Sequence, residues 1–466
     1  MAVYPRGVSI PARSRRPAAP RTLVRVTTQH AAQRPDVSAG PAGMEETPAH
    51  IAPAAPVPDA PPPAPPPASL RRNRDFLIVL FGQGISSFGD SISNTAMPIL
   101  VLALTGSGFA MGIVGVLSTL PDLVVGLPAG AYADRWDRRK MMLGADLGRA
   151  VLTALVPVSV WLGGPTLGVI IAVAFPLNVL RVLWLAAYTA AVPGLVGRDQ
   201  VPRANGIFEA VFNVGWIVGP ALAGLLAGAI GPGPTIAIDA ATFVVSAAAL
   251  FLVRRPLRPE ARAEQTHILA DVREGVRFVV RQPTLRAVIA LWTTMSVVSA
   301  GLTSALIFYI TIDRGLGSQV VGLVLSAFAV GSLGGSLIAA RLSPKPVGKV
   351  MLLGAVGFGL TLLLSVGTPI PVVVVAALLA GILNANVLVA YISLRTLLSP
   401  DALLGRVGAT ARTLSVGMMP VGSLVAGVAL DAVGGAATLS VMGWLLLVTA
   451  GGFALLPDVR RARLAG

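Results

Sequence analysis

The sequence predicts an all-α polytopic membrane protein, and three observations support that fold class. Hydrophobic residues make up 54% of the 466-residue chain and charged residues 12%, whereas about a quarter of a typical soluble domain is charged. Glycine (51 residues) and proline (37 residues) are both frequent, and membrane helices tolerate both better than soluble helices do. From Phe76 onward, long apolar windows recur along the chain. A helix needs about 20 such residues to cross the hydrocarbon core of a bilayer.

The apolar windows predict twelve transmembrane helices. Several connections between them are very short and rich in Gly and Pro, such as 163–165 and 231–234, so the helices on either side must run antiparallel. The windows lie at approximately 76–104, 109–131, 142–162, 167–190, 206–229, 235–253, 286–311, 320–340, 349–366, 372–394, 407–430 and 437–456.

Residues 1–74 form a compositionally separate N-terminal tail. They contain 16 of the 37 prolines and ten arginines, and such a segment cannot bury enough apolar surface to offset its chain entropy. We predict a disordered, Pro/Ala/Arg-rich cytoplasmic tail that is a passive extension, with Met44 as an alternative start. Recruitment of a partner or contact with anionic lipid is the other interpretation. Arg15 and Arg16 are not followed by the apolar stretch of a secretory signal.

The positive charge of the chain follows membrane topology. The net charge is +15, and 33 of the 36 Lys and Arg residues lie in the tail or in loops on one side of the predicted helices. The exceptions are Arg149 and Arg181, inside windows, and Arg314, in a loop on the other side. By the positive-inside rule, both termini are cytoplasmic in a multi-pass protein of the cell membrane. Topology accounts for the charge, so we expect no nucleic acid partner.

The longest internal loop, 254–285, divides the windows six and six. It separates an N-terminal half, 75–253, from a C-terminal half with a short tail, 286–466. Within the loop, apolar residues at helical spacing and a row of arginines predict an amphipathic helix on the inner leaflet; a simple hinge linker is a compatible interpretation. The apolar positions are Ile268, Leu269, Val272, Val276 and Val279, and the basic row is Arg273, Arg277 and Arg281.

Glycine patterns in the two halves resemble each other. Gly126 and Gly130 in the second window match Gly331 and Gly335 in the eighth. A Gly-Pro pattern in the fifth window is echoed in the eleventh, with Gly219, Pro220 and Gly224 against Pro420, Gly422 and Gly427. Such spacing predicts a duplicated six-helix unit. Two pseudo-symmetric halves that hold a substrate between them are the architecture of secondary transporters.

Two stretches resemble signatures of the major facilitator superfamily. The loop after the second window reads Gly130-Ala-Tyr-Ala-Asp134-Arg135-Trp-Asp137-Arg138-Arg139-Lys140, which is similar to the superfamily's loop 2–3 signature G-x-L-A-D-R-x-G-R-R except at Tyr132 and Asp137. The fifth window resembles the antiporter signature G-x8-G-x3-G-P-x2-G-G, with Ala223 replacing one glycine. Its matching positions are Gly206, Gly215, Gly219, Pro220 and Gly224. Over 75–456 the chain resembles the drug:proton antiporter-3 branch, which includes macrolide-efflux and enterobactin-exporter-like proteins.

The resemblance gives these two signatures roles in gating and sealing. Asp134 ends the second window, where a carboxylate can meet the positive end of an entering helix dipole; by resemblance that helix is the eleventh, near 405–406. The arginines of the loop would reach acidic groups such as Asp146 and form a cytoplasmic latch, the alternative being an ordinary positive-inside loop. The glycines of the antiporter signature, with Pro220, predict close helix packing at the interface between the halves; generic small-residue packing is the alternative.

Ionisable residues inside the windows are costly and therefore functional candidates. Those singled out for proton coupling are Asp90, Asp122, Arg181 and Glu209. Depths counted at about 1.5 Å per residue place Arg181 level with Asp122 and Glu209 but not with Asp90, so we expect a carboxylate partner for Arg181. Arg181 also resembles the arginine of the antiporters' fourth-helix signature, although Trp184 and Leu185 depart from it. The resemblance implies a role in proton coupling, and a structural ion pair is the alternative.

Asp90 belongs to a polar stripe in the first window. Gln83, Ser87, Asp90 and Asn94 recur at helical spacing, so they face a water-filled cavity or other helices. A buried carboxyl with no cation nearby binds and releases protons near neutrality. We therefore predict that Asp90 is the main proton site; a helix–helix hydrogen bond is the alternative.

The windows of the C-terminal half offer polar and aromatic candidates rather than charged ones. By resemblance, the first, fourth, seventh and tenth helices line the cavity, so we expect a largely apolar, permissive substrate wall in this half. The substrate-cavity candidates are Gln83, Asn94, Trp292, Asn384 and Asn386, with Thr293, Thr294 and Ser296 as further polar positions.

These patterns predict a secondary active transporter that exports amphipathic small molecules of drug, antibiotic or siderophore type in exchange for protons. The alternative is a major-facilitator uniporter or importer without proton antiport, in which Asp90 and Arg181 are dispensable. No Walker A, HExxH or G-x-S-x-G stretch occurs, so we do not expect an enzyme, and a non-transporting scaffold would not need both signatures. The chain has no cysteine and three histidines, so we expect neither a metal nor a cofactor.

Overall fold

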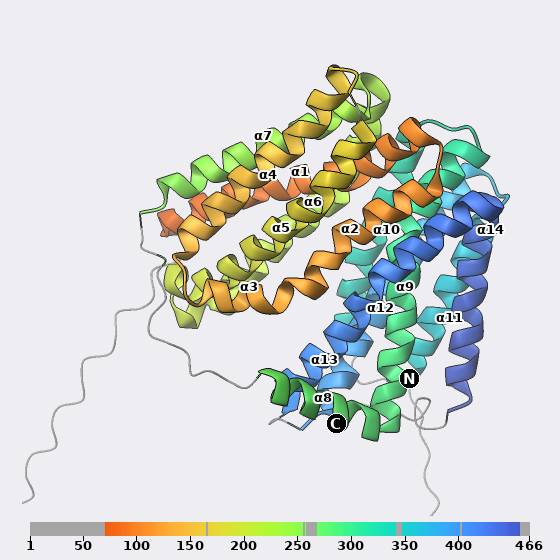
Figure 1. Ribbon diagram of the computed structural model, residues 1–466. Coiled ribbons are helices and arrows are strands. Elements are labelled where there is room, and N and C mark those ends of the chain that lie inside the picture. Colours follow the sequence, from red (N-terminus) through yellow and green to blue (C-terminus); the bar gives the residue numbers. More distant parts are fainter. Residues whose placement is uncertain are drawn as a thin grey trace, which may run out of the picture. The chain divides into compact units, whose positions relative to one another are not determined.

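The computed structural model describes residues 70–164, 166–254, 257, 268–341, 347–400 and 403–456 (Figure 1). All of them belong to a unit that spans 65–466. Of the predicted tail, 1–69 lies outside the described residues, so its predicted disorder stays a prediction. Every regular element in the described part is a helix, which confirms the all-α prediction.

The elements follow one another with few residues between them. In chain order they are η1 (Leu70–Arg72), α1 (Arg74–Thr105), α2 (Gly108–Val124), α3 (Gly126–Ala133), α4 (Arg138–Trp161), α5 (Thr166–Val196), η2 (Arg198–Gln200), α6 (Val201–Ile230), α7 (Pro232–Leu252), α8 (Ile268–Arg281), α9 (Pro283–Phe308), η3 (Tyr309–Asp313), α10 (Ser318–Arg341), α11 (Val347–Ser365), α12 (Ile370–Leu398), α13 (Leu404–Gly417) and α14 (Met419–Ala454). Side-chain caps fix some of the starts. Asn73 accepts a hydrogen bond from the Phe76 backbone N–H (3.1 Å) at the start of α1, which satisfies a donor that the first turn leaves free.

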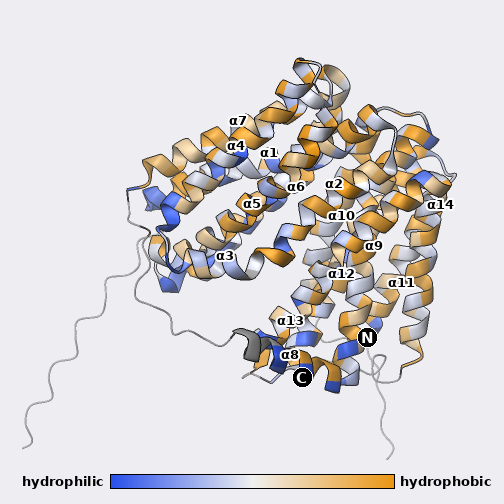
Figure 2. Ribbon diagram, in the orientation of Figure 1, coloured by the Kyte–Doolittle hydropathy of each residue, from blue (hydrophilic) through white to orange (hydrophobic). Residues whose placement is uncertain are grey.

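Ten helical stretches in the described part are long and apolar enough to cross a membrane. One of them, Leu404–Ala454, is 51 residues long and joins α13 to α14, whereas α2 is a shorter apolar helix. Figure 2 shows apolar residues along most of the length of these helices. The apolar windows were therefore correctly predicted as helices.

Two irregular regions distinguish the helices from the predicted windows. The window at 109–131 contains two helices, α2 and α3, which meet at Val125. The last two windows, 407–430 and 437–456, both extend into α14, which is interrupted at Gly434 (φ 80°, ψ 175°). This backbone conformation is essentially restricted to glycine. A single residue, and not a loop, therefore separates the last two apolar stretches.

Helices on each side of the linker pack mainly within their own group. α1 packs against α6 and α7, and α4 packs against α5 and α7. After the linker, α9 and α11 pack against α14, and α12 packs against α10 and α11. The main contacts between the two groups join α2 to α14 and α6 to α10.

The linker contains the predicted amphipathic helix as α8. Its arginine row is exposed, while Val279 is buried. α8 packs against α13 and α9, and Glu274 forms an ion pair with Arg406 of α13. The side chains of 268–272 lie outside those described. The helix itself is confirmed, and its contact with the inner leaflet stays a prediction.

Candidate functional site

Two ion pairs lie within the helices that precede the linker. Arg181 of α5 pairs with Asp122 of α2, with Nη2 2.5 Å from Oδ2. Arg149 of α4 pairs with Asp90 of α1. Arg181 therefore has the carboxylate partner that its depth predicted, and it is separate from Asp90, also as predicted.

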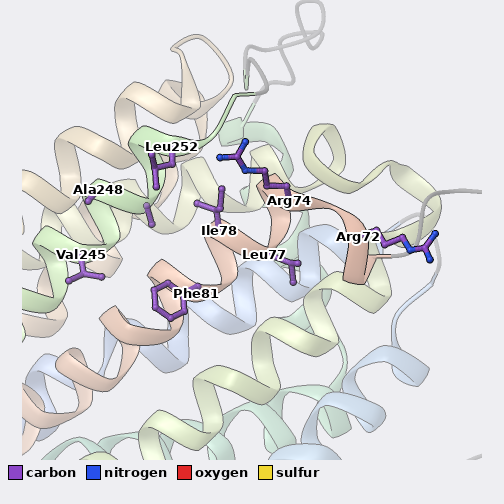
Figure 3. Close-up of a pocket in the computed structure, with 9 residues that line it drawn as sticks. Arg72, Arg74, Leu77, Ile78, Phe81, Val245, Ala248 and Leu252 are labelled. Atoms are coloured by element: carbon purple, nitrogen blue, oxygen red, sulfur yellow. The ribbon is translucent and has the colours of Figure 1, made fainter.

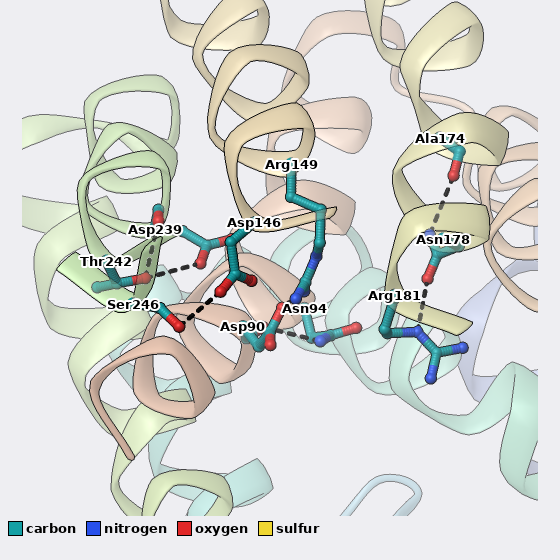
Figure 4. A network of polar contacts seen from close by, with 10 residues as sticks. All are labelled: Asp90, Asn94, Asp146, Arg149, Ala174, Asn178, Arg181, Asp239, Thr242 and Ser246. Carbon is teal, nitrogen blue, oxygen red and sulfur yellow. Dashed lines mark hydrogen bonds and ion pairs between the residues drawn. The ribbon is translucent and has the colours of Figure 1, made fainter. Parts of the chain in front are cut away.

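The Arg181–Asp122 pair is partly accessible to solvent. The Arg181 side chain is 37% exposed and that of Asp122 is 21% exposed. Arg181 Nε also donates to Asn178 Oδ1 (3.0 Å), and Asn178 donates to the carbonyl of Ala174 (3.0 Å) one turn earlier in α5 (Figure 4). The guanidinium is thus oriented by its own helix, while its carboxylate partner belongs to α2.

Glu209 does not join this pair, although its predicted depth is similar to that of Arg181. Its side chain is exposed in the first third of α6, and it makes no ion pair among the described residues. Asn213 donates to its backbone carbonyl (2.8 Å). Of the two carboxylates expected at the depth of Arg181, only Asp122 pairs with it, because depth along a helix does not fix the face on which a side chain lies.

Asp90 is not the carboxyl without a cation that the sequence suggested. Its partner Arg149 is 3% exposed, and the guanidinium carbon lies 4.0 Å from the centre of the Phe243 ring, a cation–π contact that holds the cation in place. Arg149 is eleven residues into α4 and Asp90 sixteen residues into α1, about 16 Å and about 24 Å from the helix starts.

Asp146 is buried beside this second pair and is not a partner of the loop 2–3 arginines. It is 0% exposed and accepts a hydrogen bond from Ser246 Oγ of α7 (2.7 Å). Arg139 donates instead to the carbonyls of Leu250 and Phe251 (3.0 and 2.6 Å). The expected contact fails because Asp146 is two turns, or about 10 Å, further along α4 than Arg139, and it faces α7.

Asp239 of α7 is a residue of this site that the sequence reasoning missed. It is 2% exposed and accepts a hydrogen bond from Thr242 Oγ1 (3.2 Å). It lies so close to α1 that a side chain at Gly89 would overlap it. A signal was available, because Asp239, Thr242 and Ser246 form a polar stripe at helical spacing in an otherwise apolar window.

Four residues from three helices therefore form one cluster, which we call the aspartate cluster. Figure 4 shows its members gathered between α1, α4 and α7. They are Asp90, Asp146, Arg149 and Asp239. The Arg181–Asp122 pair is not part of it.

The loop 2–3 signature does not form the predicted latch in this conformation. Asp134 and Arg135 are exposed, and Gly130 has open space where a side chain would lie. Arg138 donates to the carbonyl of Ala133 within the same turn (3.3 Å). Among the described residues, no hydrogen bond or ion pair joins Asp134 to α13. The latch stays a prediction for another conformation.

The antiporter signature packs against helices on both sides of the linker. Where a side chain is added at Gly215, it meets the backbone of Ser87 in α1 at 3.3 Å, and at Gly219 it meets Ser91, one turn further along α1, more closely still. At Gly224 it meets the carbonyl of Ser318 in α10 at 2.5 Å, whereas Gly206 has nothing within 4 Å. The expectation that the whole signature lies between the halves is corrected, because only its last part, at Pro220 and Gly224, contacts the second group of helices.

The substrate-cavity candidates lie on α1, α9 and α12 and do not share a described pocket. Trp292 stacks on Tyr391 with ring centres 5.2 Å apart. Asn94 is exposed and donates to the backbone carbonyl of Asp90 (2.8 Å). Three of the candidates have a side-chain oxygen without a hydrogen-bond partner among the described residues: Gln83, Asn384 and Asn386. Their role in substrate binding stays a prediction.

A groove of about 530 Å³ lies elsewhere, between α1 and α7. Figure 3 shows Arg72 and Arg74 near the start of α1 and apolar side chains along the rest. It contains none of the predicted site residues. The lining residues are Arg72, Arg74, Leu77, Ile78, Phe81, Val245, Ala248, Ala249 and Leu252. In the part of the chain that the structure describes, no group of three or more His, Asp or Glu residues is placed to hold a metal ion.

Comparison of the sequence with known proteins finds a family model and several efflux proteins. Residues 66–462 match the family model described as transmembrane secretion effector. The multidrug efflux pump Tap of Mycolicibacterium fortuitum is 30% identical over 400 residues, which cover 84% of this chain and 97% of that protein. Macrolide efflux protein A of Streptococcus pyogenes is 26% identical over 265 residues, which cover 56% of this chain and 65% of that protein.

Solved structures of transporters have a similar fold. A bacterial homologue of the human lysosomal transporter Spinster, in an inward-facing and unoccupied conformation, matches with a TM-score of 0.64 at 14% identity, over 85% of this chain and 99% of that one. The nucleoside transporter NupG matches with a TM-score of 0.65 at 13% identity, over 82% and 98%. At these identities the likeness concerns the fold alone.

Proposed function

Because this chain belongs to the transmembrane secretion effector family, within the drug-efflux proteins of the major facilitator superfamily, we propose that it exports amphipathic small molecules in exchange for protons. Family membership makes it a multi-pass membrane transporter of small molecules and not an enzyme. Relatives named as multidrug and macrolide efflux proteins support outward transport of drug, antibiotic or siderophore types. A uniporter or importer without proton antiport is the alternative.

The proposal includes twelve membrane crossings. α2 and α3 together form the second crossing. α13 and the part of α14 before Gly434 form the eleventh, and the remainder of α14 forms the twelfth. The other nine crossings are single helices: α1, α4, α5, α6, α7, α9, α10, α11 and α12.

Matching close contacts support two pseudo-symmetric six-helix halves, 75–253 and 286–466, joined by the linker 254–285. In α6, Gly219 packs against α1 and Gly224 against α10. In α14, the residues 203 positions later, Gly422 and Gly427, pack against α9 and α2. Exchanging the halves converts one set of contacts into the other. Two halves that move against each other around a central substrate are the basis of alternating access.

The described hydrogen bonds between the halves occur at the helix ends remote from loop 2–3. Asp431 of α14 accepts hydrogen bonds from the Ser107 hydroxyl (2.7 Å) and the Gly108 backbone N–H (2.5 Å) at the start of α2. Ser318 at the start of α10 donates to the carbonyl of Gly224 (2.9 Å). With both termini cytoplasmic in the cell membrane, these are the outer ends. We infer that this conformation is closed outside and open to the cytoplasm.

The Arg181–Asp122 pair is the observation that carries proton exchange in this proposal. A proton on Asp122 removes the charge that holds Arg181 and so weakens the contact between α2 and α5. α2 continues through α3 into the loop 2–3 signature, so the protonation state of Asp122 acts on the helix that bears the predicted latch. Partial exposure allows water to deliver the proton.

Purified protein in inside-out oriented vesicles tests the proposal. Addition of a macrolide, tetracycline, dye or siderophore substrate should move protons in the direction opposite to the substrate, and Asp122→Asn and Arg181→Gln should each reduce this movement at least tenfold. Arg203→Gln, at an exposed position near the start of α6, is the matched control and should leave it unchanged. Substrate export at the same rate after collapse of the proton gradient would support the uniporter instead.

A further inference from the structure

The aspartate cluster contains more negative than positive charge. It has three carboxyl groups, Asp90, Asp146 and Asp239, and one guanidinium, Arg149. Arg149 and Asp90 are the charged groups that lie close enough to Asp146 and Asp239 to interact with them electrostatically. The neighbouring helices α5 and α6 contribute Arg181 and Glu209, but Arg181 is paired with Asp122 and Glu209 is exposed. Full ionisation would leave the cluster with a net charge of −2.

Burial makes such a charge unfavourable. Asp146, Asp239 and Arg149 are 0%, 2% and 3% exposed, and an uncompensated charge in a low-dielectric interior is costly enough that the group is neutralised instead. Two polar atoms within the cluster also lack hydrogen-bond partners among the described residues: Asp146 Oδ1 and Arg149 Nε. Buried polar atoms without a fixed partner leave room in the cluster for a proton.

We propose that the aspartate cluster is a proton-binding site in which Asp239 carries the proton while Arg149 is paired with Asp90. Asp90 has the direct ion pair. Asp146 precedes Arg149 by one turn of the same helix and accepts a hydrogen bond from Ser246. Asp239 accepts a hydrogen bond from the Thr242 hydroxyl and has no ion pair of its own among the described residues, and it is packed against the α1 turn that bears Asp90.

The same geometry provides a route for the proton. Asp239 transfers its proton to the neighbouring carboxylate of Asp90, and Arg149 moves from Asp90 to the carboxylate left on Asp239. One proton and one guanidinium exchange places, so the charge of the cluster does not change. Asp90, with 19% of its side chain exposed, then exchanges the proton with water. Arg149 is the positioning residue, and the role of this route in export depends on the proton exchange proposed above.

Infrared difference spectroscopy of the purified, unlabelled protein tests proton binding without any transport. The wild type should show the C=O stretch of a protonated, buried carboxyl at neutral pH. Asp239→Asn should abolish that band. Asp199→Asn removes an exposed carboxylate outside both ion pairs and should leave the band unchanged. Absence of the band in the wild type, or its persistence in Asp239→Asn, would overturn the proposal.

Two further variants keep the test decisive if Asp239→Asn fails to fold. Asp90→Asn frees Arg149 to pair with Asp239, so the band should weaken. Arg149→Gln removes the cation and should strengthen the band, because more of the three carboxyls must be neutralised by protons. If the network were purely structural, the band would not change in opposite directions in the two variants. Equal changes of the band in Asp90→Asn and Arg149→Gln would contradict the proton site.

The outcomes also separate this inference from the proposed function. A band that behaves as described, together with export that ignores the proton gradient, would retain the proton site and reject proton exchange. Proton-coupled export without the band would reject the site and retain the proposed function. A band that responds to Na⁺ at constant pH would identify a sodium site and overturn the proton assignment.

Discussion

At the scale of single residues, the described part of the chain has two Arg–Asp ion pairs in different surroundings. Arg181 and Asp122 are partly exposed, whereas Arg149 is buried under Phe243 beside two further carboxyls. Partly exposed pairs typically contribute about 1 kcal/mol or less to stability. The Arg181–Asp122 pair is therefore expected to contribute little to stability, which fits the coupling role proposed for it above.

Single and double substitutions distinguish these two roles. Asp122→Asn, Arg181→Gln and the double variant should each change the free energy of unfolding by no more than about 1 kcal/mol, and all three should lose substrate-driven proton movement. Thermal unfolding in detergent and proton movement in vesicles provide the two measurements. Recovery of proton movement in the double variant would identify a structural pair, because removing both charges would then repair what removing one had damaged.

At the scale of elements, α6 is shaped by glycines whose surroundings differ along its length. Gly215 and Gly219 allow α1 to approach, Gly224 allows α10 to approach, and Gly206 faces open space. The antiporter signature thus consists of contacts with two different helices. Each glycine is explained by the backbone or side chain it meets, except Gly206, for which the packing gives no reason.

Two alanine substitutions in this one helix should have opposite effects. Gly224→Ala places a carbon against the carbonyl of Ser318 and the backbone of Gly322, at 2.5 and 2.9 Å, and overpacking of this kind costs about 1–3 kcal/mol. Gly206→Ala meets nothing and should be neutral or stabilising by up to about 1 kcal/mol, because alanine favours helix. Melting temperatures of the two variants provide the comparison. Equal destabilisation would contradict the close approach of α6 and α10.

Sequence patterns predicted the helices well because lipid selects long apolar runs, and these can be read directly. The Arg181–Asp122 pair was also predictable, since both residues lie at similar depth. The pairing of Asp90 with Arg149 was not predictable, because depth along a helix does not reveal how that helix is rotated. Asp239 could have been identified as a candidate, because it begins a polar stripe in an otherwise apolar window. The break at Gly434 depends on one backbone conformation, which hydropathy does not report.

At the scale of the whole transporter, the contact of Asp431 with the start of α2 joins the two predicted halves. Its carboxylate accepts from the backbone N–H groups of Gly108 and Phe109 and from the Ser107 hydroxyl, in the position where a helix N-terminus favours negative charge. Opening to the outside must break these bonds. Asp431 therefore contributes to the balance between the two conformations and not only to folding.

Removal of this carboxylate should shift that balance. In Asp431→Ala, spin labels on cysteines introduced at Thr105 and Val433 should report a larger population of long distances; the chain contains no cysteine of its own, so labelling is specific. Asp313→Ala is the matched control, because Asp313 accepts from the Ala436 backbone N–H (2.7 Å) within the second half. It should lower stability without lengthening the distance. Identical distance distributions in wild type and Asp431→Ala would argue against an outer closure.

The turn at Gly434 has a genetic consequence. Because no other amino acid tolerates its backbone angles, every missense change of that codon should impair the protein, whichever residue replaces it. In a saturation mutagenesis experiment, position 434 should be intolerant, whereas its neighbour Val433, whose side chain is 56% exposed, should accept many replacements.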